Sequence, residues 1–180
     1  MKPYVHSSYE RVADDYYPTI DKRCVYGFLE YFTPQGVCVD VCSPNGSGIV
    51  DTLKECGYDA YGIGDAFVDK IDAEWIITNP PYDKKIVDKI INRCIRRPMD
   101  GEVFGVAVLL RSNFDYAKSR WSMFSASANY YGQVKLLFRP WWSVEHTKSP
   151  IHSYCWHIWA NYLTGYPVVH YAKGVYASLP

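Results

Sequence analysis

The sequence predicts a Rossmann-like α/β fold, with one mixed, mostly parallel sheet that carries helices on both faces. Short apolar runs rich in β-branched residues alternate with segments of helical periodicity. A Gly-rich turn follows the first of these runs, and a later run, Trp75-Ile76-Ile77, stops abruptly at Asn79-Pro80-Pro81-Tyr82. A strand, a glycine turn and a helix in this order form the first unit of a doubly wound sheet.

Length and composition predict a single domain over residues 1–180. The chain is 48% apolar and 21% charged, as in an ordinary globular protein, and it is long enough to bury a sizeable core. A formal net charge of zero argues against a protein that coats nucleic acid without specificity. No apolar stretch is long enough to cross a membrane and no apolar signal core follows Met1, so we expect a soluble, cytoplasmic protein.

The cysteines and histidines give no metal-binding pattern. The six cysteines include no Cys-x-x-Cys pair, and several lie inside apolar runs, where they are expected to pack as small hydrophobic residues. His146, His152 and His157 have no ligand spacing, so we expect structural roles for them and no metal site.

The first half of the chain is predicted to alternate helices with strands after an N-terminal arm. Residues 1–15 show no clear period and form that arm or a short helix. Periodicity and turn residues then predict a helix over 21–32, a strand over 36–42, a helix over 49–56 and a strand over 60–63.

The second half begins with a compressed connection. Residues 66–73 are too few for the helix and strand of a complete βαβ unit, so the helix must be minimal and one strand can be missing. Beyond Tyr82, one apolar face predicts a helix over 85–96 that ends before Pro98. The remaining prediction is a buried central strand over 103–110, a helix over 120–128 and strands over 133–138, 153–159 and 166–171, with the last strands antiparallel.

The strand that ends at Asn79 presents groups that suit an exocyclic amine on an aromatic ring. Prolines terminate the strand because neither can donate a ladder hydrogen bond. The Asn79 side-chain oxygen and the Pro80 carbonyl can accept from the two N–H groups of the amine, and Tyr82 can stack on the ring. The plainer alternative is a core strand that ends at prolines, with Tyr82 as a surface aromatic residue.

Two glycines and two acids suggest a nucleoside ligand. Gly46 and Gly48 would let the backbone approach a ligand closely, and the next helix offers its N-terminal N–H groups to a carboxylate. Asp40 could accept from an ammonium group, and Asp65, after the second strand, is placed to hold ribose hydroxyls. Either acid could instead be a solvated turn residue.

Four segments together resemble the SAM-dependent (S-adenosylmethionine-dependent) DNA N6-adenine methyltransferases, most of all small phage and prophage members. They are, in order, Tyr16-Tyr17-Pro18-Thr19, Val39-Asp40-Val41-Cys42 with Gly46-Ser47-Gly48, Asp65, and Asn79-Pro80-Pro81-Tyr82. The resemblance covers roughly residues 10 to 170 and implies a class I methyltransferase fold with SAM as cofactor. It implies that the first two segments cradle the methionine half of SAM through Tyr17, Pro18, Thr19, Asp40, Cys42, Gly46 and Gly48.

The same resemblance implies that Asp65 holds the ribose and that Asn79, Pro80, Pro81 and Tyr82 hold the target base. The chain departs from the family in two places. The turn before Gly46 has an extra residue and reads Ser43-Pro44-Asn45, where a more glycine-rich turn is usual. The segment after Asp65 is too short for the usual adenine-contacting acid, a role that Asp69 or Asp72 could take.

Residues 111–150 are a possible substrate-facing segment. They hold six basic residues against two acids, which gives a local charge of +4. Such a run is commonly a solvated surface, but it also fits a phosphate-facing side. Our candidates for substrate contacts are Arg111, Arg139, Trp141 and Trp142.

The function that the resemblance implies is methyl transfer from SAM to adenine N6 in DNA, with the base flipped from a duplex or already single-stranded. The chain has no room for a separate target-recognition region, so specificity is loose or comes from the 111–150 segment or a partner subunit. Two alternatives stay open. The same site would suit an RNA base or a protein glutamine, and the fold could belong to an inactive binding or regulatory subunit.

Overall fold

Seven strands form one sheet in the order β2-β1-β3-β4-β6-β5-β7. The structure is a computed structural model that describes residues 18–43, 48–83, 86–125, 127–142, 151–163 and 165–176. The strands are β1 (Cys38–Asp40), β2 (Ala60–Gly62), β3 (Trp75–Thr78), β4 (Gly105–Arg111), β5 (Tyr130–Leu136), β6 (Tyr154–Ala160) and β7 (Val168–Ala172).

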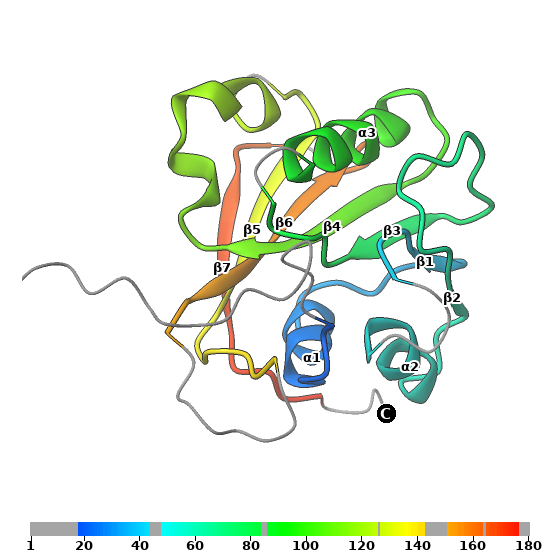
Figure 1. The fold of residues 1–180 in the computed structure, drawn as a ribbon, viewed down its shortest axis with the longest axis vertical. Helices are drawn as coiled ribbons and strands as arrows, with labels where there is room; N and C mark the ends of the chain where they lie inside the picture. The colour runs from blue at the N-terminus through cyan, green and yellow to red at the C-terminus, as the bar shows by residue number, and fades with distance from the viewer. Residues whose placement is uncertain are drawn as a thin grey trace, which may run out of the picture.

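Helices cover both faces of the sheet. The helix α3 (Val87–Met99) lies over one face, while α1 (Arg23–Leu29) and α2 (Gly48–Glu55) lie over the other (Figure 1). Two short 3₁₀ helices, η2 (Phe114–Tyr116) and η3 (Lys118–Met123), follow β4. This arrangement confirms the predicted α/β fold with a mixed, mostly parallel sheet and helices on both faces.

The alternation of side chains along β3 produces two separate cores. Trp75 and Ile77 point toward α1 and α2, where they join Phe28 and Trp156 in one buried cluster. Ile76 points the other way and packs with Ile91 and others under α3. All four residues of β3 are buried, as expected for a central strand covered on both faces.

The compressed segment after β2 explains why β2 is an edge strand. Residues 63–74 contain no helix or strand, and β2 pairs only with β1 within the described part of the chain. A strand is missing here, as the sequence allowed, but the minimal helix expected in the same segment does not form. The sheet extends instead at its other edge, where β7 pairs in parallel with β5 (Figure 1).

The prediction that the last strands are antiparallel holds only for β6. It runs against both neighbours, β4 and β5, whereas β7 is parallel to β5. The strand predicted over 133–138 is observed as β5, which begins earlier, at Tyr130, and ends at Leu136. Gly132 (φ 144°) lies at a register shift near the start of β5, where any Cβ would collide with the Val168 backbone.

Two predicted helices differ from the observed ones. The helix expected to end before Pro98 continues to Met99, because a proline in the last turn loses only one helical hydrogen bond. Its buried ring also packs, and its carbonyl accepts from the Asn161 side chain. The α-helix expected over 120–128 is replaced by η2 and η3, in a stretch rich in serine, whose side chains compete with the helical backbone.

No helix in the described ranges combines the length and apolar character that a membrane-spanning helix requires.

Candidate functional site

Polar side chains converge at the carboxyl ends of β1 and β3, which are adjacent parallel strands. Asp40, the last residue of β1, is 1% exposed. Its Oδ1 accepts a hydrogen bond of 2.6 Å from the Thr78 hydroxyl and one of 3.1 Å from the backbone N–H of Cys42. Asp40 is therefore a buried acceptor that joins the ends of the two strands, and it is not a solvated turn residue.

Thr19 and Gly48 bring the segment before α1 into the same place. A Cβ at Gly48 would lie 1.8 Å from the carbonyl oxygen of Thr19, so no side chain fits at the start of α2. The structure thus gives Gly48 a packing reason that sequence reasoning did not anticipate. The buried Thr19 hydroxyl in turn accepts a 3.0 Å hydrogen bond from Nδ2 of Asn79.

Asn79 lies directly after β3 and is 2% exposed. Its Nδ2 donates to Thr19, which fixes the orientation of the carboxamide and turns Oδ1 the other way. Oδ1 accepts a 2.6 Å hydrogen bond from the Tyr82 hydroxyl, which also lies 3.2 Å from the carbonyl oxygen of Leu109 in β4. The acceptor expected to bind an amine is therefore held in place and is covered by a hydroxyl of the same motif.

The ring of Tyr82 lies among other aromatic and cationic groups. Its centroid is 5.8 Å from that of Tyr154 and 5.6 Å from the guanidinium carbon of Arg111. Trp142 packs against Tyr154 with their ring centroids 4.9 Å apart. Burial, with Tyr154 close by, raises the pKa of Tyr82 well above its ordinary value, so the phenol stays a neutral donor at physiological pH.

The structure brings some of the predicted substrate contacts near Tyr82 and leaves others apart from it. Arg111 and Trp142 lie beside the motif, and Nε of Arg111 is buried with no hydrogen-bond partner among the described residues. Trp141 is partly buried and its backbone N–H donates to Asp21, while Arg139 is exposed. Residues 143–150 of the predicted substrate-facing segment lie outside the described residues, as does His146.

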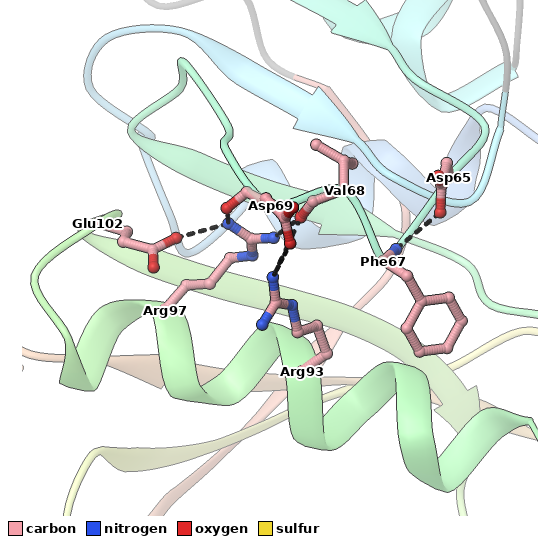
Figure 2. Close-up of polar contacts among 7 residues, drawn as sticks. All are labelled: Asp65, Phe67, Val68, Asp69, Arg93, Arg97 and Glu102. Carbon is pink, nitrogen blue, oxygen red and sulfur yellow. Dashed lines mark hydrogen bonds and ion pairs between the residues drawn. The ribbon is translucent and has the colours of Figure 1, made fainter.

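Asp65 lies three residues beyond the end of β2 and is exposed. One carboxylate oxygen, Oδ1, accepts a 2.8 Å hydrogen bond from the backbone N–H of Phe67 (Figure 2). The carboxylate thus shapes the turn and remains accessible. Of the two acids considered as partners for an adenine ring, Asp69 contacts Arg93 at 3.4 Å and Asp72 is exposed.

The remaining predicted cofactor contacts are only partly described. Pro18 is exposed, and its carbonyl accepts a 2.9 Å hydrogen bond from the Ile20 N–H. Cys42 is close to Asp40 through its backbone. Tyr17 and Gly46 lie outside the described residues.

Sequence reasoning missed three members of this site: Thr78, Tyr154 and the Leu109 carbonyl. Thr78 left a signal, since it is a polar residue at the end of an otherwise apolar strand. Tyr154 and Leu109 left none, because strand pairing and the side-chain direction of Tyr82 bring them close.

The cysteine groups argue against a thiolate as the basis of the site. Burial raises the pKa of each of the six cysteine thiols, so these thiols are protonated at neutral pH. Across the described ranges, no group of three or more His, Cys, Asp or Glu side chains is arranged to hold a metal ion. The site instead offers oriented oxygen acceptors, an arrangement suited to positioning an N–H donor.

Solved structures resemble the chain in fold. One is a Pyrococcus horikoshii protein described as a "putative RNA methyltransferase", with a TM-score of 0.50, 10% sequence identity and coverage of 77% of this chain and 80% of that one. Another is a protein of Thermoplasma acidophilum, with a TM-score of 0.42, 13% identity and coverage of 75% and 81%. No protein-family model matches the chain, and no curated protein matches its sequence. With the sheet order, the first likeness shows that the chain shares a Rossmann-like α/β fold with that protein.

Proposed function

We propose that the chain transfers a methyl group from SAM to the exocyclic N6 amine of adenine in DNA. The observation that carries the proposal is the fixed Asn79 carboxamide, buried after β3 and oriented by Thr19 next to Asp40. The resemblance in sequence of Asn79-Pro80-Pro81-Tyr82 to amino-methyltransferases and the methyltransferase fold both support it.

The residues present fit SAM. Asp65 is exposed, and only one of its carboxylate oxygens is used by the turn, so the other can accept from ribose hydroxyls. Asp40 supplies a buried acceptor near the place expected for the methionine half, and α2 begins beside it. When bound, SAM supplies an electrophilic methyl group on a sulfonium sulfur.

The protein's own contribution is orientation of the amine. The lone pair of an adenine amine is delocalised into the ring, so the nitrogen is a poor nucleophile. Acceptance of its two N–H groups by Asn79 Oδ1 and the Pro80 carbonyl would aim the lone pair at the methyl group and favour the positive nitrogen that develops in the transition state. No base of shifted pKa is needed for this step.

Tyr82 must move for the base to reach Asn79. Its hydroxyl now occupies the acceptor that the amine would use. Rotation of the side chain away from Asn79 would free that acceptor and present the ring for stacking on the base. Arg111, with its buried Nε unpartnered among the described residues, lies beside this path and is a candidate contact for the incoming nucleotide.

The test is transfer of a labelled methyl group from SAM to unmethylated duplex DNA, single-stranded DNA, RNA and protein, with wild type and Asn79→Ala. We expect label as N6-methyladenine in DNA, lost in the variant. Label in RNA or in a protein glutamine would refute DNA as substrate. SAM binding without transfer to any acceptor would refute catalysis and favour a regulatory subunit.

A further inference from the structure

A hollow of about 490 Å³ lies between the loop after β2, next to Asp65, and the outer flank of α3. It is lined by Phe67, Lys89, Asn92, Arg93 and Arg96. This flank of α3 is open because the segment after β2 contains no helix or strand to cover it. Phe67 contributes an aromatic ring that is 51% exposed, which is unusual for a phenylalanine.

The lining is cationic. Three of its five residues carry a positive charge and none carries a negative one. Within the described ranges, Lys89 and Arg96 have no carboxylate at ion-pair distance, and the neighbouring acid on α3, Asp88, is paired with Arg120 at 2.8 Å. Arg93 is paired with the exposed carboxylate of Asp69 at 3.4 Å, so the charges of Lys89 and Arg96 are the ones left for a ligand to neutralise.

Arg93 and Arg97 fix the wall opposite α3. The side chain of Arg97 is buried and binds the carbonyl oxygens of Val68 and Asp69 (Figure 2). Arg93 binds the Val68 carbonyl at 3.3 Å through Nη2, and its Nε is a buried donor without a partner in the described part of the chain. The loop is thus held against α3 before any ligand arrives.

Phe67 is placed by the same loop. Its backbone N–H donates to Asp65, and its ring projects from the turn toward solvent beside α3 (Figure 2). An exposed ring next to several cations is the combination that binds single-stranded nucleic acid, in which bases stack on aromatic rings and phosphates contact Lys and Arg.

We propose that this hollow binds the phosphodiester backbone of a single-stranded stretch of the nucleic acid substrate, with a base stacked on Phe67. The inference rests on the proposed function, because it takes the substrate to be a nucleic acid. The hollow runs along α3, which begins five residues after Tyr82 in the sequence.

The test measures the affinity of the full chain for labelled single-stranded DNA and RNA as a function of salt concentration. Each phosphate contact on a single strand contributes about 0.7 to the slope of log K against log salt. Lys89→Ala with Arg96→Ala should therefore lower the slope by about 1.4. Phe67→Ala should weaken binding severalfold without changing the slope, because stacking releases no counterion.

The matched control is Lys54→Ala. Lys54 is an exposed lysine in the last turn of α2, on the opposite face of the sheet, and its removal should leave affinity and slope unchanged. At equal ionic strength, inorganic phosphate should displace the oligonucleotide only at concentrations far above that of the oligonucleotide. Displacement by an equimolar amount of phosphate would mean a small-anion site and would overturn the proposal.

A wild-type slope in the Lys89/Arg96 double variant would also overturn it. That outcome is distinguishable from failure of the proposed function. If the wild type methylates DNA and the substitutions leave oligonucleotide binding unchanged, only the proposed role of the hollow is refuted. A wild type that methylates neither DNA nor RNA would refute the proposed function.

Discussion

Replacement of Tyr82 by phenylalanine separates the two roles of this residue. The hydroxyl donates to Asn79 Oδ1 at 2.6 Å and lies 3.2 Å from the Leu109 carbonyl, and both contacts disappear in the variant, while the ring remains. A neutral hydrogen bond is worth about 1 kcal/mol net. We therefore expect Tyr82→Phe to lower the free energy of unfolding by about 1 kcal/mol.

The same change should strengthen substrate binding. The incoming amine must displace the Tyr82 hydroxyl from Asn79, and a cost of about 1 kcal/mol corresponds to about a fivefold change in affinity. The dissociation constant for an adenine-containing oligonucleotide should fall by about fivefold in the variant, measured by fluorescence anisotropy, while urea unfolding reports the lower stability. Weaker binding by Tyr82→Phe would refute this reasoning, because it would mean that the hydroxyl contacts the substrate.

Three further predictions concern stability. Arg97→Met should lower the free energy of unfolding by about 3 kcal/mol, because the buried guanidinium donates to two backbone carbonyls and hydrogen bonds from a charged group are worth about 1.5–3 kcal/mol each. A loss below about 1 kcal/mol in urea unfolding, with Lys54→Met as control, would contradict this. Gly48→Ala should cost about 1–3 kcal/mol, since its Cβ collides with the Thr19 carbonyl, and an unchanged melting temperature would show that the contact is not rigid. Burial lowers the pKa of His157 to about 3, so the unfolded chain takes up a proton below pH 6.5 that the folded chain does not. This group should therefore cost stability as the pH falls from 6.5, by about 1.4 kcal/mol per pH unit, and a His157→Phe variant with the same pH slope would exclude it as the cause.

The order of elements could be predicted because each leaves a local pattern. The β-branched run Trp75-Ile76-Ile77 became β3, and the one-sided apolar pattern after Tyr82 became α3. The shortness of the segment after Asp65 was enough to predict the missing strand, since chain length limits what can form there. The end of α3 was not predictable in the same way, because burial of the Pro98 ring and the partner of its carbonyl depend on tertiary packing.

The placement of two candidate site residues at strand ends was predictable, but their contacts were not. Asp40 and Asn79 could be placed at neighbouring strand ends, because parallel strands align their carboxyl ends. The Tyr82 hydroxyl on Asn79 and the approach of Thr19 to Gly48 were not predictable, since both depend on side-chain direction and on segments far apart in sequence. The hollow beside Phe67 likewise depends on how the short loop lies against α3.

Calorimetric titration of the intact protein with SAM shows whether the chain binds the proposed methyl donor. We expect one site per chain, with affinity reduced about tenfold or more in Asp65→Ala, whose carboxylate is exposed and removable with little loss of stability. The absence of heat from SAM binding to folded wild-type protein would refute methyl transfer at Asn79, since the reaction requires this donor.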